Sequence, residues 1–120
     1  EANASPAKRV VLCSGKVFHD LADAKQESAS NVALVRLEQL YPFPQEAVNQ
    51  VLAKHAGAKL IWCQEEPRNM GAWKHVLEFL NHAGLEVGFV GRASSASPAT
   101  GSYRLHQAQQ TALVNQALGI

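Results

Sequence analysis

The stretch Leu-Ile-Trp-Cys at residues 60–63 is apolar without interruption, and similar runs lie at residues 10–13, 32–35 and 87–90. In none of them do polar and apolar residues alternate, as they would in a strand with one face in water. Short continuous runs that are rich in β-branched residues are typical of strands covered on both faces. The four runs therefore predict four buried strands.

Helical spacing of apolar residues fills the segments between these strands. Helices are predicted over residues 16–28, 44–55, 71–83 and 102–118. In the last helix, five side chains are expected to face inward: Leu105, Ala108, Ala112, Leu113 and Ala117. The order β-α-β-α-β-α-β-α, with crossovers of about twenty residues, favours right-handed parallel units.

These elements predict an α/β fold of three layers, with helices on both faces of a mostly parallel sheet. Gly88 interrupts the fourth run, so we expect this strand to lie at an edge of the sheet and to run antiparallel to the others. Residues 1–7 lack the apolar stretch of a signal peptide and are interpreted as a linker or tail. Residues 8–120 then form one domain, because 120 residues are too few for two independent cores.

The charge balance argues against two classes of partner. Eleven Lys and Arg residues against ten Asp and Glu residues leave a net charge of +1. A nucleic-acid binder needs a clustered basic stripe, and a polybasic membrane anchor needs a similar excess of charge. No apolar run approaches the ~20 residues that cross a bilayer. We therefore expect neither a nucleic acid nor a membrane as a partner.

The cysteines and histidines do not form a recognisable metal or catalytic motif. Cys13 and Cys63 each lie inside an apolar run, where a free cysteine behaves as a small core residue. The five histidines lie in predicted helices, without the spacing of zinc ligands. No metal site and no catalytic residue is therefore expected within the chain.

In an open parallel sheet, ligands bind beyond the carboxyl ends of the strands. Residues 14–16, 36–44, 64–73 and 91–102 are predicted to lie at that edge. Ser14, Gly15 and Lys16 join the first strand to the first helix, where backbone N–H groups and a lysine can hold a phosphate. A tight turn with a capping serine accounts for the same residues.

Two neighbouring carboxylates, Glu65 and Glu66, directly follow the third apolar run. Paired carboxylates can divide acid and base roles when their environments differ. Neighbours in an extended segment point in opposite directions, however, so this pair does not share one proton. A structural ion pair with Arg36, Arg68 or Arg92 is the simpler interpretation.

Two further segments are candidates for contacts with another domain. Asn69 can cap the third helix, and Gly71 permits close approach of a second backbone. Trp73 either seals the edge of the core or anchors a partner domain. The loop after the fourth strand carries one guanidinium and five hydroxyl groups, those of Arg92, Ser94, Ser95, Ser97, Thr100 and Ser102. It suits an anion or an interdomain contact, and equally a solvated loop that caps the last helix.

Four stretches, in this order, resemble the C-terminal domain of the thiamine-diphosphate-dependent first component of 2-oxoglutarate dehydrogenase. They are residues 9–17, 35–44, 62–73 and 91–106, within a likeness that spans about residues 8–118. The most diagnostic is Trp-Cys-Gln-Glu-Glu-Pro at residues 62–67, which continues with Asn69 and residues 71–73. One departure is Ala93, which stands where this family typically has proline.

This resemblance implies a transketolase C-terminal domain fold and a chain that is the C-terminal fragment of a much longer enzyme. The whole enzyme decarboxylates 2-oxoglutarate in the tricarboxylic acid cycle and succinylates lipoyl groups. Its thiamine diphosphate and Mg²⁺ bind mainly between two other domains. The fragment is therefore expected to be inactive alone and to bind no cofactor. The implied location is the cytoplasm of a bacterium, or the mitochondrial matrix if the source is eukaryotic.

The implied partners are the remaining domains of the same chain, a second subunit in a homodimer, and dihydrolipoyl succinyltransferase. We expect a supporting role in which one surface packs against a neighbouring domain, and it comprises Glu65, Glu66, Asn69, Gly71, Trp73 and Arg92. A second, regulatory site for an anion is expected at Ser14, Gly15, Lys16, Arg92, Ser95 and Ser97.

Three alternatives stay open on the sequence. The first is the same domain of a dehydrogenase that acts on 2-oxoadipate, because the substrate is recognised elsewhere in such an enzyme. The second is a stand-alone regulatory module that binds an anion or a nucleotide. The third is a protein-interaction domain that recruits the succinyltransferase core.

Overall fold

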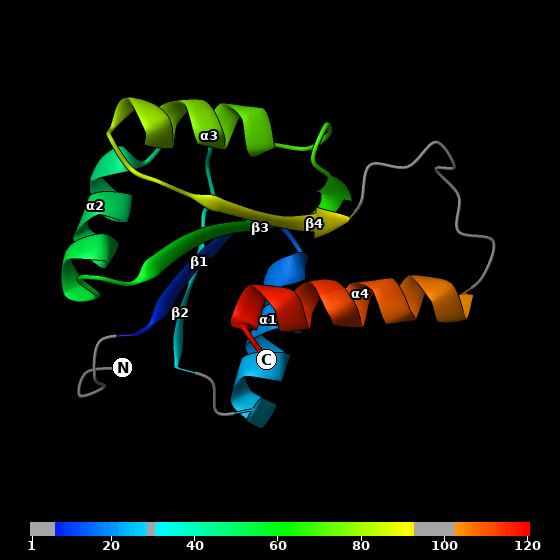
Figure 1. Ribbon diagram of the computed structural model, residues 1–120. Helices are drawn as coiled ribbons and strands as arrows, with labels where there is room; N and C mark the ends of the chain where they lie inside the picture. Colours follow the sequence, from blue (N-terminus) through cyan, green and yellow to red (C-terminus); the bar gives the residue numbers. More distant parts are fainter. Residues whose placement is uncertain (1–6, 29–30, 93–102) are drawn as a thin grey trace.

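The computed structural model describes residues 7–28, 31–92 and 103–120. Strands and helices alternate along the chain (Figure 1), in the order β1 (Arg9–Cys13), α1 (Val17–Ser28), β2 (Val32–Arg36), α2 (Gln45–Lys54), β3 (Lys59–Pro67), α3 (Trp73–His82), β4 (Gly88–Arg92) and α4 (Tyr103–Leu118). All eight predicted elements are present, and β3 continues beyond the predicted run to Pro67. Within the described ranges, no helix has the length and apolar character needed to cross a bilayer.

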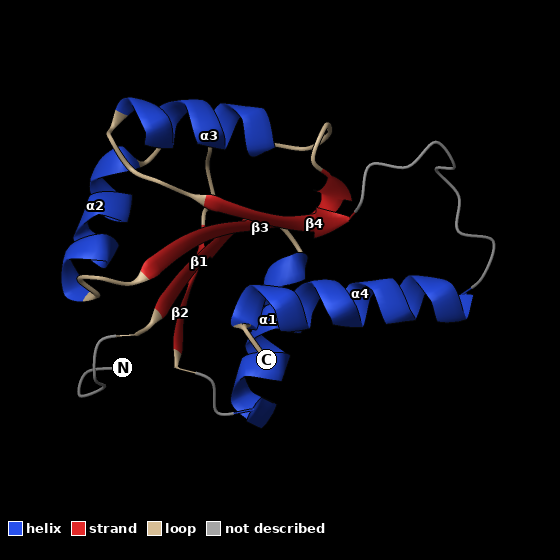
Figure 2. Cartoon of the chain, in the orientation of Figure 1, coloured by secondary structure: helices blue, strands red, loops and turns tan. Residues whose placement is uncertain are grey.

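The four strands form one sheet in the order β2-β1-β3-β4. Helices α1 and α4 cover one face, while α2 and α3 cover the other (Figure 2). Successive residues of a strand point to opposite faces, so a sheet covered on both sides needs apolar residues at every position. This requirement explains the continuous runs, and it confirms the predicted three-layer fold.

The predicted antiparallel direction of the edge strand is wrong. β4 does lie at the edge of the sheet, but it pairs with β3 in parallel, with Gly88 opposite Ile61 and Val90 opposite Cys63. The reason is the crossover, because α3 returns the chain to the amino edge of the sheet and β4 then starts in the same direction as β3. The glycine identified an edge position, but it carried no information on direction.

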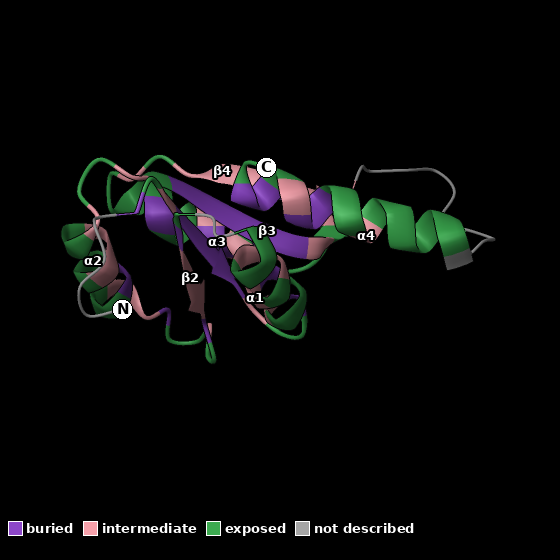
Figure 3. Ribbon diagram, turned by 90° about the horizontal axis from the view of Figure 1, so that it is seen from below, coloured by how far each residue is buried: buried purple, intermediate pink, exposed green. Residues whose placement is uncertain are grey.

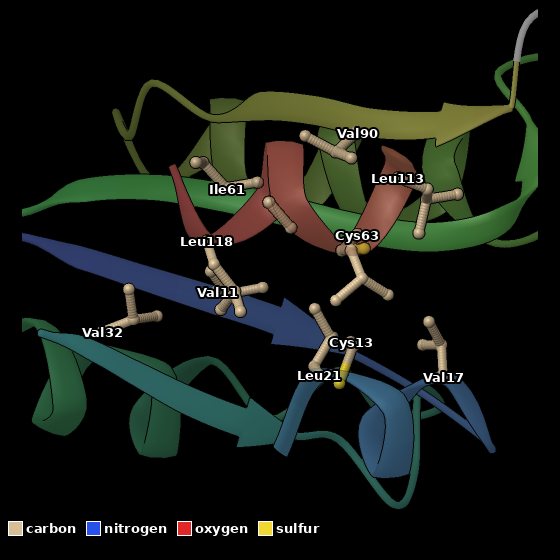
Figure 4. Packing of buried hydrophobic residues seen from close by; sticks show 12 residues of the cluster. Val11, Cys13, Val17, Leu21, Val32, Ile61, Cys63, Val90, Leu113 and Leu118 are labelled. Carbon is tan, nitrogen blue, oxygen red and sulfur yellow. The ribbon is translucent and has the colours of Figure 1, made fainter. Parts of the chain in front are cut away.

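Each face of the sheet has its own apolar core. Val11 and Cys13 of β1, with Ile61 and Cys63 of β3, face α1 and α4 (Figure 4). The alternate residues face α2 and α3, in a cluster that comprises Val10, Leu12, Leu37, Phe43, Val48, Leu60, Trp62, Trp73, Val76 and Leu80. The two cores thus share β1 and β3.

Helix α4 differs from the predicted inward face. Its buried side chains are Leu113, Val114, Ala117 and Leu118, whereas Leu105, Ala108 and Ala112 are exposed. At about 100° per residue, the three exposed positions lie on the side of the helix opposite to the buried ones. Only the C-terminal part of α4 lies on the sheet, and the other end extends past it (Figure 3). The C-terminal end of α4 is bonded to β1, because the Arg9 guanidinium donates a hydrogen bond to the backbone carbonyl of Ala117 at 3.4 Å.

Candidate functional site

Three of the four predicted edge segments lie where the strands end. Residues 14–16 follow β1, residues 37–44 follow β2, and residues 68–72 join the end of β3 to α3. The fourth begins with Arg92 at the end of β4, but residues 93–102, including Ser95 and Ser97, lie outside the described residues.

Lys16 and Glu65 join two of the candidate sites in one ion pair. The Lys16 Nζ lies 2.8 Å from the Glu65 Oε1, and the side chains are 80% and 20% exposed respectively. The hydrogen bond and charge of Glu65 raise the pKa of Lys16. Glu65 therefore forms a structural ion pair as expected, with Lys16 as its partner in place of the three arginines considered. The cation predicted to hold an anion is already neutralised by this carboxylate.

A chain of hydrogen bonds continues from Glu65 to Arg92 through α4. The Arg92 guanidinium donates to Gln110 Oε1 at 2.7 Å and to Gln109 Oε1 at 2.9 Å. The Gln110 side-chain amide in turn donates to Asp20 at 2.9 Å and to Glu65 at 3.2 Å. We call Lys16, Asp20, Glu65, Arg92, Gln109 and Gln110 the polar network. It connects three strand ends with α1 and α4.

Three members of the polar network were not predicted from the sequence: Asp20, Gln109 and Gln110. They lie within helices and belong to no motif, and Gln110 is 90 positions from Asp20 and 45 from Glu65. Only the fold brings them together, so no local signal could have identified them.

Gln64 organises the turn that links β3 to α3. This buried side chain accepts a hydrogen bond from the Trp62 indole at 2.9 Å. Its amide donates to the backbone carbonyls of Pro67 at 2.8 Å, Met70 at 2.7 Å and Glu66 at 3.2 Å. A polar residue at the end of a continuous apolar run was the available signal, since a buried amide needs partners.

Gly71 closes the same turn in a left-handed conformation, with φ +69°. A Cβ atom at this position would lie 3.0 Å from Gln64 Oε1 and 3.1 Å from Glu66 Oε1. The nearest atoms therefore belong to side chains of the same turn, and not to a second backbone as predicted.

Trp73 seals the core of this domain. Its side chain is 6% exposed and its ring centroid lies 5.0 Å from that of Phe89. The Arg68 guanidinium covers the pair, 4.7 Å from the Phe89 centroid and 5.9 Å from that of Trp73. Glu66, Asn69 and Gly71 are the members of the predicted packing surface that are exposed.

Cys13 and Cys63 are buried side by side in register on β1 and β3. Desolvation by burial raises the pKa of Cys13 to about 11 and that of Cys63 to about 12. Both thiols are therefore protonated at neutral pH, which suits core packing and not nucleophilic attack. Among the described residues, no three His, Cys, Asp or Glu side chains are grouped closely enough to hold a metal ion.

A groove of about 350 Å³ separates α1 from α4 beside the polar network. Asp20, Asp23 and Glu27 form one wall, and Gln107 and Thr111 belong to the other. A second hollow, of about 630 Å³, lies at the opposite edge of the sheet, between the segments that lead into β3 and β4. Among the described residues, the carboxyl edge is a polar surface on which Lys16, Glu65 and Arg92 have partners within the chain.

Comparison with known proteins identifies close sequence relatives. Residues 1–118 match the family model described as 2-oxoglutarate dehydrogenase C-terminal. The 2-oxoglutarate dehydrogenase E1 component of Cupriavidus necator is 48% identical over 98% of the chain, which spans 13% of that relative. The E1 component of Rickettsia typhi is 50% identical over 92% of the chain, which spans 12% of that relative. The E1 component of Haemophilus influenzae is 45% identical over 98% of the chain, which spans 13% of that relative.

A solved structure described as "Split gene transketolase, inactive beta4 tetramer" shares the fold. It matches 94% of this chain and 40% of its own, with a TM-score of 0.63 and 18% identity. The fold implied by the diagnostic stretches is therefore confirmed. On the family match and the identity to its relatives, the chain belongs to the 2-oxoglutarate dehydrogenase C-terminal family.

Proposed function

We propose that this chain is the C-terminal supporting domain of a 2-oxoglutarate dehydrogenase E1 component. The whole enzyme would decarboxylate 2-oxoglutarate and transfer the succinyl group to lipoyl groups on dihydrolipoyl succinyltransferase. The observation that carries the proposal is the family match over residues 1–118, together with identities of 44–50% to relatives of that description. Those relatives are bacterial, which supports a location in the bacterial cytoplasm.

The cofactors of the whole enzyme, thiamine diphosphate and Mg²⁺, are assigned to parts of the protein outside this chain. When bound, thiamine diphosphate supplies the electron sink for decarboxylation. The described residues offer no three-ligand group for a metal ion, and Lys16 is neutralised by Glu65. These observations support the proposal that the cofactors bind elsewhere and that this chain supports the enzyme's shape.

The proposed packing surface is the carboxyl edge around Glu65, Glu66, Asn69, Gly71 and Arg92, with the predicted member Trp73 buried in the core beneath it. The Gln64 hydrogen bonds and the polar network support this choice, because a surface held rigid loses little entropy when it docks. Residues 1–7 are proposed as the linker that joins residues 8–120 to the preceding part of the enzyme. The Ala7 N–H donates to His55 Nδ1 at 2.8 Å, which fixes the end of that linker at the amino edge of the sheet.

Charge reversal in the full-length enzyme tests the packing surface. Glu66→Lys, at an exposed position of that surface, is expected to weaken the dimer or the turnover of 2-oxoglutarate by about tenfold. Glu86→Lys is the matched control, because Glu86 is exposed at the opposite edge. Equal dimer dissociation and turnover for both variants would remove the packing surface from the proposal.

The substrate is tested by comparing kcat/KM of the full-length enzyme for 2-oxoglutarate and 2-oxoadipate. These acids differ by one methylene, which a fitted pocket distinguishes by about tenfold or more. Preference for 2-oxoadipate would replace the proposed reaction with the alternative one. Activity of the isolated 120-residue chain on either acid would overturn its supporting role.

A further inference from the structure

An exposed cluster of aromatic side chains lies outside the site described so far. Tyr41 and Phe43 come from the loop between β2 and α2, and His75 and Phe79 come from α3. We call these four residues the aromatic patch. The Tyr41 side chain is 74% exposed and that of Phe79 is 39% exposed, whereas Phe43 is buried beneath them. Among the described residues, Tyr41 and Phe79 are two of five large apolar side chains exposed to this degree.

The patch is held in place although it faces water. The Tyr41 ring packs on His75 with a centroid distance of 4.1 Å, and Phe43 stacks on Phe79 at 5.2 Å. The His75 Nε2 atom is 2.8 Å from the Leu40 carbonyl, to which it donates as Nε2–H. The Gln39 side chain holds the loop from the other side through a 2.7 Å bond to the Tyr41 carbonyl. An exposed tyrosine fixed in this way has little conformational entropy left to lose on binding.

This chemistry is typical of a protein interface. Tyrosine is enriched among the residues that dominate binding energy, because its ring buries a large apolar area and its hydroxyl keeps a polar contact. A polypeptide surface with apolar side chains would remove the Tyr41 and Phe79 rings from water.

Building on the proposed function, we propose that the aromatic patch is covered by the part of the parent polypeptide that precedes this domain. The chain spans 13% of its Cupriavidus necator relative, so most of an enzyme of that length is available to cover it. Both segments of the patch begin near the carboxyl edge, where the proposed packing surface also lies. The loop with Tyr41 leaves β2 at the carboxyl edge, and α3 starts directly after the turn that carries Asn69.

Hydroxyl-radical footprinting of the wild-type full-length enzyme tests whether the patch is covered. The modification rate of Tyr41 in the native enzyme is divided by its rate in the denatured enzyme, and Trp62, which is 1% exposed, is the buried reference. We expect Tyr41 to be protected about tenfold or more, as Trp62 is. A native rate close to the denatured one would overturn the proposal.

Photo-crosslinking identifies the occupant. p-Benzoylphenylalanine replaces Tyr41, which keeps an aromatic ring in the patch, and a second enzyme carries it at the exposed Lys54 as control. Crosslinks from position 41 to peptides that precede this domain support the proposal. Crosslinks to a second copy of this domain, or the same crosslinks from both positions, overturn it. Turnover of 2-oxoglutarate is measured separately. An enzyme that turns over 2-oxoglutarate but leaves Tyr41 unprotected would overturn the covering of the aromatic patch and leave the proposed function standing.

Discussion

Gln64 shows how one buried polar residue can fix a functional edge. Its amide oxygen accepts from the Trp62 indole, and its amide nitrogen donates to the backbone carbonyls of Glu66, Pro67 and Met70. At 4% exposure, the side chain has little access to water that could replace these partners. The position of the β3–α3 turn therefore depends on this amide.

Gln64→Leu is expected to lower the free energy of unfolding of the chain by about 2–4 kcal/mol, because it leaves the Trp62 N–H and several carbonyls without partners. Denaturant unfolding measures the change. Gln50→Leu is the control, since Gln50 is exposed on α2 and its replacement should change stability by less than about 0.5 kcal/mol. Equal effects for the two variants would show that the amide does not hold the turn.

Gly71 and Gly57 form a matched pair of left-handed glycines. Both have positive φ, +69° and +84°, but only at Gly71 would a Cβ meet other atoms, those of Gln64 and Glu66. Each Ala substitution should cost about 1–2 kcal/mol for the backbone conformation. Gly71→Ala should cost about 1 kcal/mol more, because the Gln64 amide is tied by hydrogen bonds and cannot move away freely. The prediction fails if thermal unfolding gives equal values for the two variants.

The buried thiols predict an alkaline loss of stability. The folded pKa of Cys63 is raised to about 12 from an ordinary value of 9.0, so its neutral form favours the folded state. This contribution is complete below pH 9 and is lost as the pH rises from 9 towards 12. Urea unfolding between pH 7 and 10.5 should therefore show a steeper decline for the wild type than for Cys63→Ala. Parallel declines would contradict the assigned cause.

Helix α4 is the element with two environments. Its C-terminal half is buried on the sheet, and its other half is held at the edge by hydrogen bonds of Gln109 and Gln110. Gln110 contacts Arg92, Asp20 and Glu65, whereas Gln109 contacts Arg92, so Gln110 makes most of the bonds that join α4 to the polar network.

Gln110→Ala is expected to lower stability by about 1 kcal/mol and to speed amide hydrogen exchange in the first half of α4. Gln116→Ala serves as control, since Gln116 is exposed on the same helix and makes no side-chain bond described above. If exchange in α4 is unchanged by Gln110→Ala, the network does not hold the helix.

Strands and helices could be predicted from the sequence where the local pattern of apolar residues was enough to determine them. The run at residues 60–63 indicated a strand because both of its faces are covered, and helical spacing predicted a helix over residues 71–83, where α3 lies. The direction of β4 depends on the crossover, which Gly88 does not report. On α4 the prediction was confirmed for Leu113 and Ala117 and wrong for Leu105, Ala108 and Ala112. Alanines carry little burial signal, and Gln110, which lies on the inward side, is polar. The polar network and the aromatic patch required the tertiary structure, since their members come from separate elements.

At the scale of the whole molecule, two cores share one sheet. Val10 and Leu12 face the α2 and α3 side, whereas Val11 and Cys13 face the α1 and α4 side. A strand cannot leave one core without leaving the other, so the two layers should unfold as one cooperative unit.

The two tryptophans allow a test of this coupling, because Trp62 and Trp73 both lie in the α2 and α3 core. Leu113→Ala removes apolar volume from the other core and should cost about 2–4 kcal/mol. The tryptophan fluorescence transition should shift by the same amount as the far-UV circular dichroism transition. A fluorescence midpoint that stays at the wild-type value would show that the layers unfold separately.

The bond between Ala7 and His55 has a mechanical consequence. It fixes the entering chain at the amino edge, directly before β1, which is flanked by β2 and β3 in a parallel ladder. If the carboxyl edge is anchored to a neighbour, tension on the entering chain runs along the strands. The inter-strand bonds on both sides of β1 are then loaded in shear, all together, and not opened one after another like a zipper. The domain is stiffest along the axis in which its two attachments would pull.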